Sequence, residues 1–175
     1  MKKTLFLVAS LTAISAVCAG VLAYVNKLTE DPIAATKSAN ETRAAMEVMP
    51  GGVAKVEKLG DGAFVGRDAS GAAAGYAVAG RDAGGYGGDI ELMVGFEKDR
   101  KTIVAYRKLL AAETPGLGMK LVSPEFAGQF AGKDATSLKV TKDGGEIEAI
   151  TSATITSRAV CNAIADAARK AASLK

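Results

Sequence analysis

The pattern of apolar positions begins with an uninterrupted run from Leu5 to Val25 that contains no charged residue. At a helical rise of about 1.5 Å per residue, a run of this length covers the roughly 30 Å hydrocarbon core of a bilayer. Lys2 and Lys3 precede the run, and positive charge tends to stay on the cytoplasmic side. We therefore predict that residues 1–25 form a cytoplasmic tip and a single-pass anchor in the inner (cytoplasmic) membrane, with the rest of the chain on the extracytoplasmic side.

A cleaved signal peptide is the alternative interpretation of the same segment. Two lysines followed by apolar residues also begin secretory signals, and residues 16–23 offer small side chains where a peptidase cuts. The apolar run is longer than the usual core of such a signal, which favours an anchor that is retained. Both interpretations place the remaining chain outside the cytoplasm.

Residues 26–52 have a polar, alanine-rich pattern that predicts a juxtamembrane helix or linker. Pro32 lies near the start of this segment, and the Pro-Gly-Gly sequence at residues 50–52 ends it with a turn signal. The remaining residues, 53–175, have the length of one globular domain. We expect them to form a single domain.

Short apolar segments between glycines and charged turns predict a sheet in this domain. Residues 53–88 alternate glycine-rich pieces with short apolar ones, which is typical of short strands and tight turns. Residues 90–96 and 102–106 have the composition of two strands, and the charged turn between them predicts a hairpin at the centre of the sheet. Residues 138–140 and 147–150 alternate apolar and polar side chains, which predicts a second hairpin.

The last part of the chain has the periodicity of an amphipathic helix, which we predict from about Ile155 to Ser173. Asp166 and Lys170 form a pair of opposite charges one turn apart on its polar side. Its apolar positions recur every three or four residues, at Val160, Ala163, Ile164, Ala167, Ala171 and Leu174. The predicted fold class is α+β: a small mixed or antiparallel sheet packed against a C-terminal amphipathic helix, preceded by one N-terminal transmembrane helix.

The composition narrows the chemistry that this chain can perform. The sequence contains no histidine, which removes the commonest general base near neutral pH and the commonest ligand for zinc, copper and haem iron. The two cysteines, Cys18 and Cys161, fall in separate predicted helices, so we expect no disulfide between them, and a four-thiolate iron–sulfur cluster is excluded. The net charge of +3 is small and the basic residues are interspersed with acidic ones, so we expect no nucleic acid partner. Redox chemistry in this chain would need an organic cofactor.

Hydroxyl side chains crowd the start of the C-terminal helix. Residues 151–158 have the sequence Thr-Ser-Ala-Thr-Ile-Thr-Ser-Arg, although a single Ser or Thr suffices to cap a helix. One interpretation is that Thr151 or Ser152 caps the helix and the other hydroxyls are surface residues. The other is chemical: a phosphate on Thr154 would lie at a helix N-terminus, where backbone N–H groups and the helix dipole favour negative charge. Arg158 follows one turn later and is either a phosphate ligand or a partner in a structural ion pair.

Residues 151–160 resemble the flavinylation motif of the FMN-binding domain family. This family includes the G subunit of the Rnf ion-translocating electron-transport complex and the C subunit of the sodium-translocating NADH:quinone reductase. In its pattern an acidic residue is followed, after two positions, by Ser or Thr, a small residue, Ala and the acceptor Thr. The residues that fit this pattern are Glu148, Thr151, Ser152, Ala153 and Thr154. Two of them depart from it, with glutamate in place of aspartate and serine in place of glycine. The resemblance implies FMN attached through its phosphate to the Thr154 hydroxyl, with the motif residues and Arg158 around it.

Two further segments support the same resemblance. Residues 113–118 (Glu-Thr-Pro-Gly-Leu-Gly) are similar to a segment of the Rnf-type protein that lies against the isoalloxazine ring, and residues 84–96 also resemble that protein. Glycines in the first segment permit close approach of the backbone to a flat ring. The resemblance therefore implies further FMN contacts from Tyr86, Glu113, Thr114, Gly116, Leu117 and Gly118.

The resemblance implies a membrane-anchored flavoprotein subunit that relays electrons within an ion-translocating complex, and not a stand-alone enzyme. Its partners would be other membrane subunits of that complex, and a flavin transferase would attach the FMN, using FAD as donor and Mg²⁺. Two alternatives stay open. One is an extracytoplasmic sensory or assembly module whose flavin site is structural or empty. The other is a flavin-dependent reductase of a small substrate, against which the short chain with no additional substrate domain argues.

Overall fold

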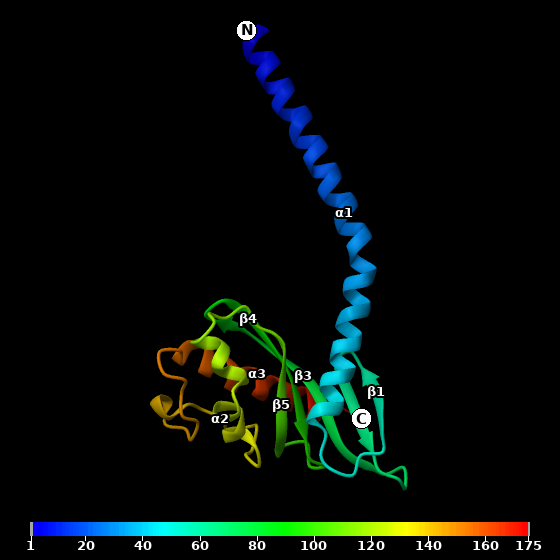
Figure 1. Ribbon diagram of the computed structural model, residues 1–175, viewed down its shortest axis with the longest axis vertical. Coiled ribbons are helices and arrows are strands. Elements are labelled where there is room, and N and C mark those ends of the chain that lie inside the picture. The colour runs from blue at the N-terminus through cyan, green and yellow to red at the C-terminus, as the bar shows by residue number, and fades with distance from the viewer. Residues whose placement is uncertain (1, 175) are drawn as a thin grey trace. The chain divides into compact units, whose positions relative to one another are not determined.

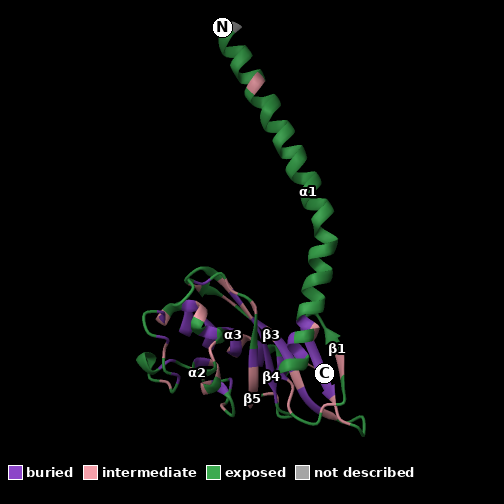
Figure 2. Cartoon of the chain, in the orientation of Figure 1, coloured by how far each residue is buried: buried purple, intermediate pink, exposed green. Residues whose placement is uncertain are grey.

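The computed structural model describes residues 2–174 and divides the chain into two units, one that ends at Ala39 and one that begins at Asn40. Helix α1 (Lys2–Val48) runs through both. Its part in the first unit is exposed along nearly its whole length (Figure 2). This helix is long and apolar enough to cross a membrane, and none of its most apolar stretch is buried. It is the candidate membrane helix that the sequence predicts.

Helix α1 continues without a break across residues 25 and 26, where the sequence predicts the change from anchor to linker. The helix continues through Pro32, and the hydroxyl of Thr36 donates to the Pro32 carbonyl at 2.8 Å. It ends at Val48, just before the predicted turn. The residues from Asn40 onward belong to the second unit, so the last turns of the segment predicted as a linker form part of the folded domain.

The second unit contains a five-stranded antiparallel sheet in the order β1-β2-β3-β4-β5 (Figure 1). Its strands are β1 (Lys55–Gly60), β2 (Ala63–Arg67), β3 (Ala73–Gly85), β4 (Gly88–Phe96) and β5 (Ile103–Leu110). The short strands predicted within residues 53–88 and the hairpin predicted within residues 90–106 are confirmed. The predicted central position of that hairpin is wrong for β5, which forms an edge of the sheet because the chain leaves the sheet after Leu110.

Helices cover both faces of the sheet. Helix α3 (Thr154–Ser173), drawn in orange to red in Figure 1, crosses one face and packs on β3 and β4. On the other face the end of α1 completes a second, smaller core, which consists of Ala44, Ala45, Val48, Phe64, Ala77 and Met93. Strand β4 is therefore buried on both sides from Leu92 to Phe96, which explains why its sequence is apolar without alternation.

Two glycines allow the helices to approach the sheet this closely. A Cβ atom on Gly80 of β3 would lie 2.0 Å from the carbonyl oxygen of Ala163 in α3. A Cβ atom on Gly95 of β4 would lie 1.9 Å from the carbonyl oxygen of Val48 in α1. Since no side chain fits at such distances, glycine is required at both positions.

Helix α3 confirms the predicted C-terminal helix. The predicted apolar positions inside it, from Val160 to Ala171, are buried, and Leu174 lies just after the helix, packed against the same core. The predicted pair of charges also forms, since Lys170 Nζ lies 2.7 Å from Asp166 Oδ2. The observed α+β fold, with its C-terminal helix packed on the sheet, agrees with the predicted class.

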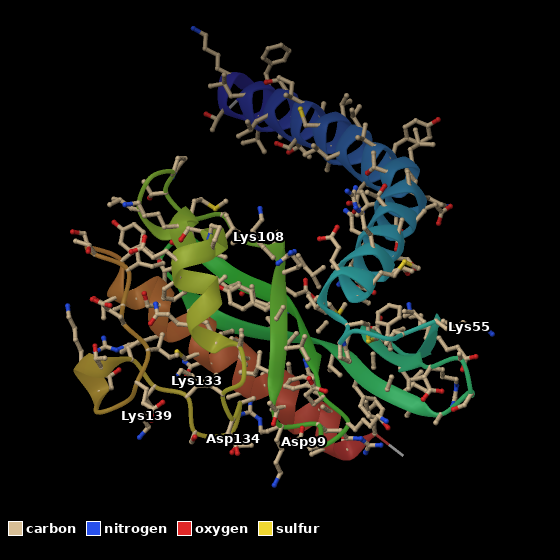
Figure 3. The ribbon with its side chains drawn as sticks, turned by 60° about the horizontal axis from the view of Figure 1, so that its bottom comes forward. Lys55, Asp99, Lys108, Lys133, Asp134 and Lys139 are labelled. Atoms are coloured by element: carbon tan, nitrogen blue, oxygen red, sulfur yellow. The ribbon has the colours of Figure 1, made fainter. Side chains whose placement is uncertain are left out.

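The connection from β5 to α3 is built of short turns held by aromatic packing. It contains η1 (Gly118–Val122), α2 (Pro124–Ala127), η2 (Gly128–Phe130) and η3 (Thr141–Asp143). Phe130 makes edge-on contacts with Tyr106 and with Phe126, each with ring centroids 5.4 Å apart. Asp99 and Asp134 lie near each other where this connection meets the β4–β5 turn (Figure 3), and an isolated bridge joins Thr102 to Asp134 there.

The second predicted hairpin, residues 138–140 with residues 147–150, is wrong. An isolated bridge joins Val140 to Ile147, but the two segments run parallel at this bridge, whereas hairpin strands run antiparallel. Val140, Ile147 and Ile150 are nevertheless buried. The alternation therefore marks side chains that anchor an irregular loop to the core, without marking strands.

Candidate functional site

Helix α3 begins at Thr154 without a side-chain cap. Its N-cap residue is Ala153, whose methyl group has no hydrogen-bond acceptor to offer. Thr151 and Ser152, the two residues that sequence considerations favour as caps, are exposed, and neither caps the helix. That capping interpretation is therefore wrong, because the turn places both residues before the N-cap position.

Ser157, in the first turn of α3, fixes the turn that precedes the helix. Ser157 is fully buried, and its hydroxyl donates to the Ala153 carbonyl at 3.0 Å and accepts the N–H of Ile150 at 2.9 Å. Ser152 lies within this turn with φ at 63°, in the left-handed region. A Cβ atom in that region costs about 1–3 kcal/mol, so the geometry explains why glycine is usual at this position of the motif.

The first backbone amides of α3 are available to an anion. Among residues 2–174, no group accepts the N–H of Thr154, Ile155 or Thr156, and the first helical bond runs from the N–H of Ser157 to the Ala153 carbonyl at 3.0 Å. Free amides at a helix N-terminus, together with the helix dipole, favour a bound negative charge. The half-buried Thr154 side chain lies at the same point.

Two basic residues lie close to this helix start, and they have different partners. Arg158 forms a bidentate ion pair with Asp143, with Nε–Oδ2 and Nη2–Oδ1 distances of 2.6 and 2.7 Å. These hydrogen bonds lower the pKa of the Asp143 carboxyl and raise the pKa of Arg158. Of the two roles predicted for Arg158, the structure therefore has the ion pair. Lys142, in contrast, donates from Nζ to the hydroxyl oxygen of Thr154 at 3.2 Å.

The buried side chain of Glu113 links three segments of the chain next to the start of α3. Glu113, only 6% exposed, accepts the hydroxyl proton of Thr156 at 2.9 Å and the N–H of Gly87 at 3.2 Å. Glu113 follows β5, Gly87 lies in the β3–β4 turn, and Thr156 belongs to α3. A Cβ atom on Gly118 would lie 2.4 Å from Glu113 Oε2, so the loop after β5 closes on this carboxylate only with glycine there. The network sets the distance between the loop and the helix.

These segments enclose an open cleft of about 570 Å³, within the usual range for small-molecule sites. Its lining consists of Tyr86, Glu113, Thr114, Leu117, Gly118, Ser152, Ala153, Thr154, Ile155 and Thr156. Three of its apolar side chains are unusually exposed: Tyr86 (72%), Ile155 (50%) and Leu117 (43%). The cleft therefore combines an anion-binding helix start with apolar surface, which suits a ligand that has a flat apolar part and an anionic group.

Comparison with known proteins identifies the family. Residues 85–169 match the family model described as FMN-binding domain. The chain is 32% identical over 167 residues to the G subunit of the ion-translocating oxidoreductase complex of Methanosarcina acetivorans, and the alignment covers 90% of this chain and 88% of that protein. The chain belongs to the family of G subunits of ion-translocating oxidoreductase complexes.

Two other proteins extend this comparison. The G subunit of the Na⁺-translocating ferredoxin:NAD⁺ oxidoreductase complex of Acetobacterium woodii is 33% identical over 179 residues, which cover 88% of this chain and 84% of that one. Among solved structures, the C subunit of the Na⁺-translocating NADH-quinone reductase from Parabacteroides distasonis superimposes with a TM-score of 0.50 at 27% identity. That superposition covers 60% of this chain and 57% of the other. This chain and that quinone reductase subunit therefore share a fold over the superposed part.

Most residues predicted for the flavin site of this G-subunit family member meet at the cleft. Those that line it are Tyr86, Glu113, Thr114, Leu117, Gly118, Ser152, Ala153 and Thr154. Thr151, Gly116 and Arg158 do not line it. Thr151 borders a separate hollow of about 350 Å³ together with Glu148, and Gly116 provides a left-handed turn with φ at 78°.

The sequence-based prediction does not include three residues of this site. Ile155 and Thr156 line the cleft, and Lys142 contacts the Thr154 hydroxyl. The sequence contains a signal for Ile155, because this large apolar residue lies outside the apolar stripe of its helix. It contains none for Lys142, which falls in a turn between two wrongly predicted strands.

Among residues 2–174, no three Cys, Asp or Glu side chains are arranged to hold a metal ion. Cys161 is buried in α3, and burial raises the pKa of its thiol to about 12. This thiol therefore stays protonated and unreactive near neutral pH.

Proposed function

We propose that this chain is the electron-carrying flavoprotein subunit of a membrane-bound ion-translocating oxidoreductase complex, with FMN attached through its phosphate to Thr154. Membership in the G-subunit family supports the role and the complex, and the match to the FMN-binding domain supports the cofactor. One observation carries the attachment: Thr154 is the first residue of an uncapped helix, and its side chain lies in the cleft beside three free amides.

The residues present fit both parts of FMN. The amides of Thr154, Ile155 and Thr156 would hold the phosphate, for which a helix N-terminus is suited. The exposed apolar surfaces of Tyr86 and Leu117 would border the isoalloxazine ring. FMN supplies the capacity to accept one or two electrons, and the chain supplies position and electrostatic surroundings.

The membrane anchor supports the proposed location. Lys2 and Lys3 would remain in the cytoplasm and the flavin domain would lie on the other side of the membrane. Other membrane subunits of the complex would donate and accept the electrons. A flavin transferase with bound Mg²⁺ would attach the FMN from FAD: the pyrophosphate bond of FAD would break, the FMN phosphorus would bond to the Thr154 oxygen, AMP would leave, and the hydroxyl proton would be released. A covalent link suits this location, because an extracytoplasmic protein has no pool of free FMN from which to refill its site.

Covalent attachment is tested by co-expression with a flavin transferase, followed by denaturing electrophoresis and detection of flavin fluorescence in the protein band. The unmodified sequence should give a fluorescent band and Thr154→Ala a dark one. Ser173→Ala is the control: it removes an exposed hydroxyl at the other end of the same helix, outside both the motif and the cleft, so its band should stay fluorescent. Fluorescence in Thr154→Ala would refute this acceptor, and a dark band for the unmodified sequence would favour the module with an empty flavin site.

A further inference from the structure

Lys142 reaches the proposed attachment atom from a different segment of the chain. Its Nζ atom donates to the Thr154 hydroxyl oxygen at 3.2 Å, and among the described residues this is the side-chain partner that Thr154 has. An ammonium group has donors but no acceptor. The oxygen therefore receives this hydrogen bond, while its own proton stays available to another acceptor.

The turn that carries Lys142 is fixed on both sides. Asp143, the next residue, is held by the bidentate pair with Arg158 of α3. Val140, two residues earlier, is buried in the core, and its carbonyl accepts the N–H of Asp143 at 2.8 Å. The backbone of Lys142 is therefore anchored to the same helix that begins with Thr154, and only its side chain has freedom.

The ion pair with Asp143 also determines whether Arg158 or Lys142 is available to bind a phosphate. Both oxygens of Asp143 are taken by two nitrogens of Arg158, so moving Arg158 to another anion would break two charge-assisted hydrogen bonds. Lys142 has no carboxylate partner among residues 2–174, and its contact with a neutral hydroxyl is easily exchanged. Of these two cationic groups, Lys142 is therefore the one that can follow a negative charge at Thr154 without losing an ion pair.

On the basis of the FMN attachment proposed above, we propose that Lys142 is the positioning residue and counter-charge for the flavin phosphate at Thr154. A phosphoester on the Thr154 oxygen places phosphorus one covalent bond from the atom that Lys142 already contacts. The negatively charged phosphate oxygens then lie within reach of the ammonium group, and the free amides of α3 face the same charge. Before attachment, the same ammonium group orients the hydroxyl and favours negative charge on its oxygen. The Asp143–Arg158 pair holds the turn and does not contact the phosphate.

The test compares initial rates of flavin attachment to the full-length, detergent-solubilised protein by a flavin transferase supplied with FAD and Mg²⁺. Lys142→Gln should lower the rate by roughly tenfold, the effect of losing one charge-assisted hydrogen bond. Lys142→Arg should recover most of the rate. Lys139→Gln is the matched control, because Lys139 belongs to the same loop and points away from the sheet (Figure 3). Its rate should equal that of the unmodified sequence.

Two further readouts separate positioning from a structural role. The rate difference between Lys142→Gln and the unmodified sequence should shrink at high salt, since an exposed charge is screened, whereas a folding defect would persist. In native flavinylated protein, the phosphorus NMR signal of the phosphoester should shift in Lys142→Gln, and the shift should disappear on denaturation. Equal attachment rates together with identical phosphorus signals would overturn the role of Lys142, as would an equal loss of rate in Lys139→Gln. No attachment to the unmodified sequence would overturn the FMN linkage itself.

Discussion

The hydrogen bond between Glu113 and Thr156 should make a measurable contribution to the stability of the domain. It joins a carboxylate that is 6% exposed to a hydroxyl side chain that is 1% exposed, over 2.9 Å and across 43 positions of the sequence. The perturbations are Thr156→Val, which removes the donor at nearly constant shape, and Glu113→Gln, which removes the charge. The two changes are then combined in a double variant.

The expected size follows from the burial of both partners. A hydrogen bond to a charged group contributes about 1.5–3 kcal/mol, and water cannot replace it at this depth. Thr156→Val should therefore lower the free energy of unfolding by roughly 2 kcal/mol. Glu113→Gln should cost a similar amount, because its amide retains one acceptor but turns N–H groups toward Thr156 or Gly87. The double variant should lose less than the sum, with a coupling of roughly 1.5 kcal/mol.

Urea unfolding of the detergent-solubilised full chain, followed by far-UV circular dichroism, measures these values. Thr151→Val is the control, since Thr151 is exposed, and it should change stability by less than about 0.5 kcal/mol. A coupling below about 0.5 kcal/mol would fall within ordinary additivity. That result would refute the claim that this carboxylate and hydroxyl hold the cleft together.

Three other changes probe the surroundings of the cleft. Ser152→Gly should raise the free energy of unfolding by up to about 1 kcal/mol, because it relieves a left-handed residue with φ at 63°, and a lower urea midpoint would contradict this. Gly118→Ala should cost about 1–3 kcal/mol in the same assay, since its Cβ atom would lie 2.4 Å from Glu113 Oε2, and unchanged stability would show that the loop is not closed on this carboxylate. Hydrogen bonds from Arg158 are the chief cause of the lowered pKa of the Asp143 carboxyl. This ion pair should therefore stabilise the fold fully at pH values above the ordinary pKa of 3.8. The stabilisation should be lost as the pH falls through the lower pKa of the folded state. Carboxyl NMR titration checks this, since the midpoint should rise in Arg158→Gln and an unchanged midpoint would exclude the ion pair as the cause.

The elements that the sequence predicts well are those marked by a regular spacing of apolar residues or by one long apolar run. Helix α3 shows its apolar face at every third or fourth position, and the long apolar run of α1 needs no tertiary partner to be recognised. The alternation around Val140 and Ile147 is also real, but a period of two reports which side chains are buried and not which backbone groups pair. The predicted hairpin failed for this reason.

The inner structure of the site depends on partners that are far away in the sequence. The hydroxyls of residues 151–157 look alike in the sequence, yet Thr156 and Ser157 face inward while Thr151 and Ser152 face solvent. Only the position of Glu113 after β5 decides what Thr156 binds. The pairing of Arg158 with Asp143, and with it the freedom of Lys142, likewise appears only when the loop and α3 are seen together.

Peptide mass spectrometry of protein co-expressed with a flavin transferase shows whether FMN is bound covalently to Thr154. Trypsin cuts after Lys142 and Arg158, so the motif lies in one peptide, from Asp143 to Arg158. This peptide should gain the mass of one FMN less one water, and fragmentation should assign the added mass to Thr154. An unmodified peptide, or an added mass on Thr151 or Ser152, would contradict it.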